Sequence, residues 1–455
     1  MSIHRVVRSL AAAAVLVFAG SAAHAQLDPP SGPVEETGTP LGEINPGTPI
    51  SSLPSAANAV HVISEPGRYY LDRDIADPGA GVFAILVTTS TNVTIDMNGF
   101  AIDGNGAETQ AAIGLDAGVV TIENGTIRDW GSFAIVENDA TLTLRRLVLR
   151  NIAGASAAAL NRYTVIEDCV FDANANPLRF NGGTVAGVQP GIVIKDTRFI
   201  AMPAAIDASN AVGVQLLDCN FSGLGAASSA IKVVLGADAQ VVRCNFHTGG
   251  ENGLQAGDGA QILDSRFTGI VTGSTFGISV GNAAVISRCI VKNYSGNGIN
   301  ALNNCLIEGT AVNGCGAVGI LIGSTGIVRG CVFQDNVSGG LAPGFGVRIE
   351  GNTFRTNGYG VLLRTNATSG DCLVKDNTFD EDQLIIDGFD NVIDGNTFTD
   401  SIPAILHNSG GNLIQRNVFN AGGIGGSVST ALSVVFPTRT GADLAFAGPF
   451  DNILY

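Results

Sequence analysis

The sequence GNTF at residues 351–354 returns as DNTF at 376–379, GNTF at 395–398 and RNVF at 416–419. Earlier in the chain the same frame occurs with Cys in place of Asn, as DCVF at 168–171, DCNF at 218–221, RCNF at 243–246 and GCVF at 330–333. Each copy joins a small or turn-forming residue to a strand that carries an aromatic anchor. A motif that recurs with a period of roughly 20 to 50 residues indicates a repeat architecture.

With weaker copies included, an apolar anchor recurs about every 23 residues, which fits one turn of a parallel β-solenoid. The anchors are Ile102, Ile127, Val148, Phe171, Phe199, Phe221, Phe246, Phe267, Val291, Ile307, Phe333, Phe354, Phe379, Phe398 and Phe419. Short strands within each period alternate apolar and polar residues, and this alternation directs the apolar members inward. We predict an all-β solenoid of three-strand coils with about 14–15 turns, in which each coil is stabilised by its neighbours.

A column of small polar residues lies two positions before the anchors. Its members are Cys169, Thr197, Cys219, Cys244, Ser265, Cys289, Cys305 and Cys331, followed by Asn352, Asn377, Asn396 and Asn417. Stacked Asn side chains can form a hydrogen-bonded ladder, and Cys fits the same narrow slot as a compact, weakly polar side chain. We therefore expect a structural role for these cysteines, with only Cys315 and Cys372 off the column.

The N-terminal segment has the features of a secretory signal. Arg5 and Arg8 precede an apolar run, and the small residues Ala23-His24-Ala25 precede Gln26, so we expect cleavage after Ala25. We predict a signal peptide at 1–25, a Pro/Gly/Ser/Thr-rich flexible linker at 26–58, the solenoid at 59–426 and a C-terminal cap at 427–455. The protein is then secreted, periplasmic or on the cell surface.

Charge excludes some partners. The chain has a formal net charge of -16, with 24 basic and 40 acidic residues, which disfavours nucleic acid and anionic lipid. Beyond the signal no apolar run is long enough to span a membrane, so we expect no membrane insertion. A polyanionic ligand would need a local basic patch that acts against the overall field.

The repeats resemble a known family. The copies GNTF, DNTF and RNVF, with the opening VISEPGRYYL at 62–71 and VTIDMNGF at 93–100, are similar to the right-handed parallel β-helix repeats of the pectate-lyase-like superfamily. The resemblance covers about residues 59–425 and implies that fold. It implies an exported polysaccharide-binding protein, in a superfamily that contains polysaccharide lyases, glycoside hydrolases, epimerases, tailspikes and adhesins. The local catalytic signatures of polygalacturonases and uronan epimerases are absent from this sequence.

The strand that opens each coil offers a candidate ligand stripe. If its aliphatic residues point inward, its outward neighbours in successive coils are Asp207, Lys232, Gln255, Ser279 and Asn300. A sugar unit of an extended glycan is about as long as the rise of one coil, about 4.8 Å, so such a column could follow a polysaccharide. Asp207 and Lys232 could act as an acid–base pair. Polar outward residues are also what any soluble solenoid presents.

Two further sets of residues are weaker candidates. His247 and Glu251 are expected in a loop that borders the stripe, where they could contact substrate. The acidic residues Asp380, Glu381, Asp382, Asp387, Asp390 and Asp394 could offer oxygen ligands to calcium. They lack an ordered calcium-loop signature, so we expect solvated acids and no cofactor.

Two functional hypotheses remain open from the sequence. The first is an exported β-helix that binds an extracellular polysaccharide or cell-surface glycan, with lyase or hydrolase activity left undecided. The second is a non-catalytic structural or adhesive solenoid whose stripe has no ligand. Contiguous polar residues favour the first, and the missing catalytic signatures with only 6% aromatic residues favour the second.

Overall fold

The fold was analysed in a computed structural model. It describes residues 47–455 except 117, 139, 155–157, 161, 181–190, 224–230, 250–251, 271–274, 365–369, 402, 421–422, 426–433, 436–437, 441–450 and 455. The predicted signal peptide and most of the predicted linker lie outside these residues, so both stay predictions. Among the described residues no helix is long and apolar enough to cross a membrane.

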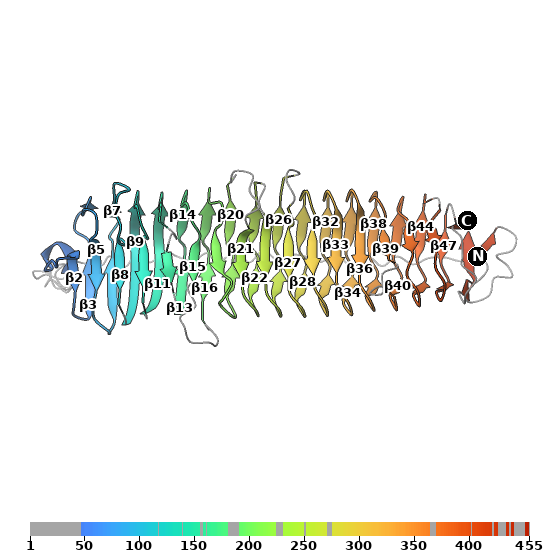
Figure 1. The fold of residues 1–455 in the computed structure, drawn as a ribbon, viewed down its shortest axis with the longest axis horizontal. Helices are drawn as coiled ribbons and strands as arrows, with labels where there is room; N and C mark the ends of the chain where they lie inside the picture. Colours follow the sequence, from blue (N-terminus) through green and yellow to red (C-terminus); the bar gives the residue numbers. More distant parts are fainter. Residues whose placement is uncertain are drawn as a thin grey trace, which may run out of the picture. The chain divides into compact units, whose positions relative to one another are not determined.

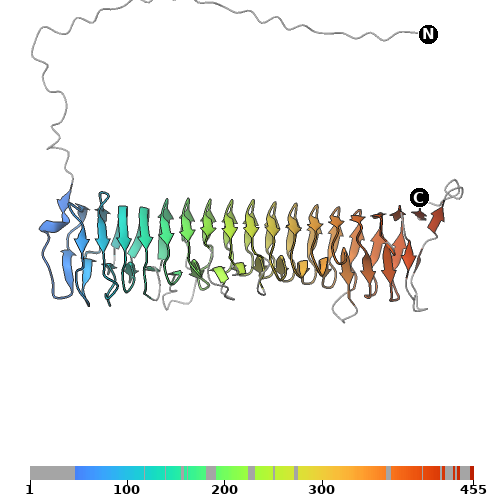
Figure 2. The ribbon, with the colours of Figure 1, turned by 90° about the horizontal axis from the view of Figure 1, so that it is seen from above.

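The described chain is an all-β solenoid of about fifteen turns, as the repeat predicted (Figure 1). Each complete coil contributes one strand to a first sheet and two to a second sheet, and neighbouring coils pair in parallel. Figure 2 shows equivalent strands of successive coils side by side along the stack. The backbone hydrogen bonds of each coil are therefore made by the coils before and after it.

The first sheet contains one strand per coil. Its strands are β2 (Ala59–Ile63), β5 (Phe83–Val87), β8 (Ile113–Leu115), β10 (Ile135–Glu137), β12 (Ala158–Leu160), β15 (Leu178–Phe180), β18 (Ile206–Ala208), β21 (Ile231–Leu235), β24 (Asn252–Ala256), β27 (Ile278–Val280), β30 (Ile299–Ala301), β33 (Val318–Ile322), β36 (Gly339–Pro343), β39 (Val361–Leu363), β42 (Leu384–Ile386), β45 (Ile405–His407) and β48 (Ile424–Gly425).

The second sheet is formed by the second and third strands of the coils. The second strands are β3 (Gly67–Tyr70), β6 (Val93–Asp96), β13 (Arg162–Glu167), β16 (Val193–Lys195), β19 (Gln215–Leu217), β22 (Gln240–Val242), β25 (Gln261–Leu263), β28 (Val285–Ser287), β31 (Leu306–Glu308), β34 (Ile327–Arg329), β37 (Arg348–Glu350), β40 (Leu373–Lys375), β43 (Val392–Asp394), β46 (Leu413–Gln415) and β49 (Val434–Val435). The third strands are β4 (Ile75–Ala76), β7 (Ala101–Asp103), β14 (Val170–Asp172), β17 (Arg198–Ile200), β20 (Asn220–Ser222), β23 (Asn245–His247), β26 (Arg266–Thr268), β29 (Ile290–Lys292), β32 (Ala311–Asn313), β35 (Val332–Gln334), β38 (Thr353–Arg355), β41 (Thr378–Asp380), β44 (Thr397–Thr399), β47 (Val418–Phe419) and β51 (Asn452–Leu454).

A few elements depart from this plan. Two long strands, β9 (Gly118–Arg128) and β11 (Ala140–Arg150), run through both positions of the second sheet. At the N-terminal end β1 (Thr48–Pro49) pairs with β3 and is followed by the 3-10 helix η1 (Ile50–Ser52). At the other end β49 pairs with β46, β51 pairs with β47, and β50 (Thr438–Thr440) pairs with β51. Strand pairing thus includes residues of the segments expected to form the linker and the cap.

The anchors form the core. The predicted Phe anchors have no exposed surface, and they stack from Phe171 to Phe267 and from Phe333 to Phe419 with ring centroids 4.4–5.2 Å apart. Val291 and Val312 separate the two stacks, because β29, β32 and β35 align Val291 with Val312 and Val312 with Phe333.

Two predicted anchors were wrong. Val312, rather than Ile307, continues the anchor column, and Ile307 belongs to the second strand β31. Leu149, rather than the preceding Val148, aligns with Phe171 and is buried. The two errors have different causes. Val148 and Leu149 are adjacent apolar residues, and only strand register decides which of them points inward. Ile307 follows Cys305 by two residues and so resembles an anchor, although it is a buried residue of the second strand β31.

In most coils a single residue in the left-handed backbone region turns the chain from the second to the third strand. This residue is usually Asp or Gly, as at Asp376 (φ 53°) and Gly395 (φ 67°), and in some coils Arg, as at Arg416 (φ 55°). Asp and Gly tolerate positive φ better than most residues. The column of small polar side chains follows directly after this turn.

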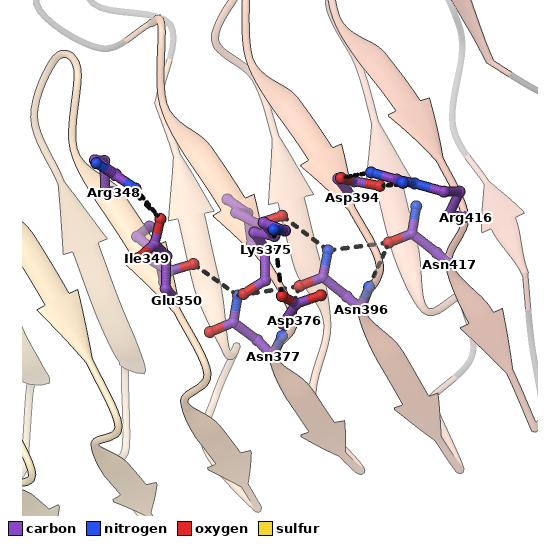
Figure 3. A network of polar contacts seen from close by, with 11 residues as sticks. Arg348, Ile349, Glu350, Lys375, Asp376, Asn377, Asp394, Asn396, Arg416 and Asn417 are labelled. Carbon is purple, nitrogen blue, oxygen red and sulfur yellow. Dashed lines mark hydrogen bonds and ion pairs between the residues drawn. The ribbon is translucent and has the colours of Figure 1, made fainter. Parts of the chain in front are cut away.

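The Asn part of that column is a hydrogen-bonded ladder, as predicted (Figure 3). Asn377 Oδ1 accepts hydrogen bonds from Asn352 N and Nδ2 at 2.9 and 3.0 Å, and Asn377 donates to Asn396 Oδ1 in the same way. Asn417 continues the ladder and donates to Asn452 Oδ1. The buried amides at this corner are thereby satisfied.

The cysteines line the wall of the solenoid. All eight are buried and free of disulfides, and burial raises the pKa of Cys289 to about 11 and of Cys331 to about 12. Such thiols stay protonated at neutral pH, which fits the predicted structural role. One placement was wrong: Thr310, not Cys305, stands between Cys289 and Cys331, and Cys305 instead precedes a second strand, as Cys372 does.

A second ladder at the next corner contains one ionisable group. Asn336 donates to Asn357 Oδ1, and Asn357 donates to the two carboxylate oxygens of Asp382 at 2.7 and 2.5 Å. Asp382 is 1% exposed, and burial raises the pKa of this carboxyl from 3.8 to about 6 despite the hydrogen bonds from Asn357.

This raised pKa makes stability depend on pH. In the folded protein the Asp382 carboxyl keeps its proton up to a pH of about 6, whereas in the unfolded chain it loses the proton near its ordinary pKa of 3.8. The contribution of this group to stability is therefore fully present below about pH 4 and is lost as the pH rises to about 6. Asp382→Asn should therefore stabilise the protein by about 1–2 kcal/mol at pH 7 and by almost nothing at pH 4. Urea unfolding at both pH values measures this, with Asp400→Asn, an exposed turn position at φ 56°, as the matched control. An equal effect of both substitutions would contradict the assignment.

Candidate functional site

Three of the predicted stripe residues lie in register on the outer face of the first sheet. Gln255 on β24 aligns with Ser279 on β27, which aligns with Asn300 on β30. In the next coil the position is Leu321 on β33, which is 43% exposed. The side chains of Gln255, Ser279 and Asn300 therefore follow one another at the rise of one coil, about 4.8 Å.

The placement of Lys232 was wrong. β18 and β21 pair Ile206 with Val233 and Asp207 with Val234, so Val234 occupies the outward position that was assigned to Lys232. Lys232 has no exposed surface, and its Nζ donates a hydrogen bond to the carbonyl oxygen of Met202. Lys232 therefore does not stand beside Asp207 on the outer face, where the acid–base pair was predicted.

The burial of Lys232 follows from its position in the coil. One coil later the same position, just before the paired core of the strand, is Gly253, where an added Cβ would lie 2.2 Å from the carbonyl oxygen of Gly277. Lys232 and Val233 are both buried, so strict alternation of inward and outward residues does not extend back to Lys232.

Asp207 has a different partner from the one predicted. It aligns with Arg179 of the preceding coil, and Arg179 Nε lies 3.7 Å from Asp207 Oδ2. Ser209 also donates its hydroxyl to Asp207 Oδ1 at 3.0 Å. Val234 separates this charged pair from Gln255, so the five-residue polar stripe is reduced to three contiguous residues.

His247 was also misplaced. It lies at the end of the third strand β23 in the second sheet, exposed, rather than in a loop beside the stripe. The hollow that it lines contains none of the stripe residues. Glu251 lies outside the described residues, and its role stays a prediction.

The three aligned polar residues line one hollow of about 320 Å³. Leu302 and Leu321, 53% and 43% exposed, form part of its wall, together with Gly257 and Gly281. Hydrogen-bonding groups beside exposed aliphatic carbon match the hydroxyls and the C–H faces of a sugar ring. No ionisable side chain lines this hollow among the described residues, so it offers binding groups and no proton-transfer group.

The amide of Asn300 is oriented by its neighbours. Asn297 Oδ1 accepts a hydrogen bond from Val318 N at 3.1 Å, which fixes Asn297 Nδ2 as the donor to Asn300 Oδ1 at 2.8 Å. This network assigns Nδ2 of Asn300 as the group left to donate toward the hollow. The side chains of Gln255 and Ser279 have no hydrogen-bond partner among the described residues.

The acids considered for calcium are distributed over separate contacts. Asp380 pairs with Arg355, Asp394 pairs with Arg416, and Asp382 is a member of the second Asn ladder. Figure 3 shows the Asp394–Arg416 pair beside Asn417. The calcium hypothesis gains no support from this arrangement.

The parallel pairing and the coil register define the class: this chain is a right-handed parallel β-helix protein, as the sequence resemblance implied. Residues 229–379 match the family described as "Right handed beta helix region". No curated protein matches the sequence.

Several solved structures are similar to this chain at low identity. Tailspike protein 3 of bacteriophage CBA120 is 12% identical with a TM-score of 0.40, and the match covers 84% of this chain and 58% of the tailspike. The A-module of mannuronan C-5 epimerase AlgE4 from Azotobacter vinelandii is 12% identical with a TM-score of 0.29, covering 81% and 91% of the two chains. A tailspike of E. coli bacteriophage HK620, solved with a hexasaccharide, is 11% identical with a TM-score of 0.23, covering 87% and 71%.

Sequence reasoning missed the true neighbours of Asp207 and the basic residues beside His247. Arg266 and Lys292 directly flank the anchors Phe267 and Val291, and residues beside an inward anchor point outward. Their outward position was therefore readable from the repeat. The Asp207–Arg179 pair could not be predicted in this way. Its two residues lie on the first-sheet strands β15 and β18, which carry no anchor motif, and only the register of these strands aligns them.

Proposed function

We propose that this protein binds an extracellular polysaccharide along the outer face of its first sheet, with Gln255, Ser279 and Asn300 as the hydrogen-bonding residues. The observation that carries the proposal is their alignment on three successive coils in one hollow. Because the rise of a coil is about the length of a sugar unit, each residue can meet an equivalent group of a linear glycan. Export through the predicted signal peptide would place the site where such glycans occur.

The lining of the hollow favours a neutral glycan and binding without catalysis. Amide and hydroxyl groups exchange hydrogen bonds with sugar hydroxyls, while Leu302 and Leu321 cover C–H surface. Proton transfer requires a titratable group within hydrogen-bond reach, and Lys232, which was predicted to supply one, is buried and does not line the hollow.

The double variant Gln255→Ala, Asn300→Ala tests the site. We expect binding to a neutral β-glucan or mannan to weaken at least about tenfold, since each lost hydrogen bond contributes about 0.5–1.5 kcal/mol. The melting temperature should change little, because Gln255 is exposed and Asn300 is half-buried. Isothermal titration calorimetry with a panel of neutral glycans measures the affinity.

Asn313→Ala is the matched control, since it removes a half-buried amide from the third strand β32 on another face. It should leave binding unchanged. Failure of all tested glycans to bind, or equal affinity of the double variant and the unaltered protein, would favour the structural or adhesive solenoid instead. The apolar outward residues Leu362 and Leu406, farther along the first-sheet column, are the feature that favours that alternative.

A further inference from the structure

A separate basic surface covers the third strands from β17 to β29. The outward residues that precede the anchors are Arg198, Asn220, Asn245, Arg266 and Ile290, and those that follow them are Ile200, Ser222, His247, Thr268 and Lys292. We call these ten positions the basic face. None of them is acidic, although acids outnumber bases 40 to 24 in the whole chain.

Two described carboxylates at the turns beside this face, those of Asp218 and Asp264, are paired with arginines of their own. Asp218 is held by Arg243 through two hydrogen bonds of 2.7 Å, and Asp264 is held by Arg288 through bonds of 2.6 and 2.9 Å. Each of these acids is thus matched by an arginine of the adjoining turn. Arg198, Arg266 and Lys292 have no ion-pair partner among the residues that the structure describes.

The same surface is hollowed. A depression of about 650 Å³ is lined by Arg243, Cys244, Asn245, His247, Asp264, Arg266, Thr268 and Lys292. Arg266 and Lys292 lie on neighbouring coils. Thr268 lies on the same strand as Arg266, β26, and aligns with Lys292 on β29. A planar guanidinium, an ammonium and neutral hydrogen-bonding groups in one depression are suited to an oxyanion.

We propose that the basic face binds the carboxylate or sulfate groups of a linear acidic polysaccharide, at a site distinct from the first-sheet stripe. The extent of the face favours a polymer over a small anion. Arg198 and Arg266 are three coils apart, about 14 Å at the rise of one coil, a span that a chain of charged sugar units covers and a single ion does not. The acidity of the rest of the surface would confine such a polymer to this face.

The double variant Arg266→Gln, Lys292→Gln tests this proposal in the full-length protein. Affinity for polygalacturonate or dextran sulfate should fall at least about tenfold, because two charge-assisted contacts are lost. Binding to the unaltered protein should also weaken steeply between 0.05 and 0.5 M NaCl, since exposed charges are screened. The carboxylated and the sulfated polymer distinguish the two sources of the oxyanion, and inorganic sulfate alone should compete only weakly.

Arg348→Gln is the matched control, because it removes one positive charge from a residue already paired with Glu350 on β37. It should change polyanion affinity less than twofold. Equal losses in the control and the double variant, or no polyanion binding at low salt, would overturn the proposal. The stripe variant Gln255→Ala, Asn300→Ala should retain polyanion binding. Loss of polyanion binding in this variant would mean that the stripe, and not the basic face, binds the polymer.

Discussion

Replacing Asn377 by Ala is expected to lower the free energy of unfolding by about 3–5 kcal/mol. Its side chain is completely buried and joins three coils: it accepts from Asn352 N and Nδ2, and it donates to Ile349 O at 2.8 Å and to Asn396 Oδ1 at 3.0 Å. The Ala variant leaves these groups unpaired inside the wall, and each buried unsatisfied group costs about 1–3 kcal/mol. Urea unfolding followed by circular dichroism measures the loss.

A graded series makes this prediction specific to the ladder. At the equivalent position Ser265 accepts a hydrogen bond from Cys244 N and donates to Leu263 O at 2.8 Å, so Asn377→Ser should recover part of the loss. Thr378→Ala, on the exposed side of the adjoining strand, should cost less than about 0.5 kcal/mol. If the Ser and Ala variants were equally unstable, the hydrogen bonds would not be the cause.

Lys232→Ala is expected to lower the free energy of unfolding by about 2–4 kcal/mol, although an exposed lysine at this point would contribute little. The substitution removes a fully buried side chain, leaves a cavity and deprives the Met202 carbonyl of a donor. Differential scanning calorimetry should show the loss as a lower melting temperature.

Lys232→Met separates packing from hydrogen bonding. Methionine fills much of the same volume, so this variant should lose less stability than the Ala variant. Neither substitution should alter glycan affinity at the stripe under conditions where the protein is folded, because Lys232 does not line that hollow. A stable Lys232→Ala variant with weakened binding would show that the side chain faces the ligand after all.

Much of the candidate site could be predicted because the repeat carries its own register. Gln255, Ser279 and Asn300 each follow a glycine and an aliphatic residue, and this repeated local pattern identifies equivalent positions. The coil that contains Lys232 lacks this glycine. Its strand β21 has five residues where β18 has three, and the sequence offers two alignments of similar apolar pattern. A slip of two residues exchanged Val234 for Lys232 in the predicted stripe.

The sequence by itself determined the solenoid, its period, the inward Phe stacks and the Asn ladder, because each of these repeats from coil to coil and depends only on local alternation and on one turn residue. Tertiary structure alone decided which of two adjacent apolar residues is the anchor, that Lys232 is buried, that Asp207 pairs with Arg179, and that His247, Arg266 and Lys292 line one depression. These facts depend on how neighbouring coils align. In a stack where every coil packs only on its neighbours, lateral register sets the surroundings of each side chain, and the local sequence does not specify it.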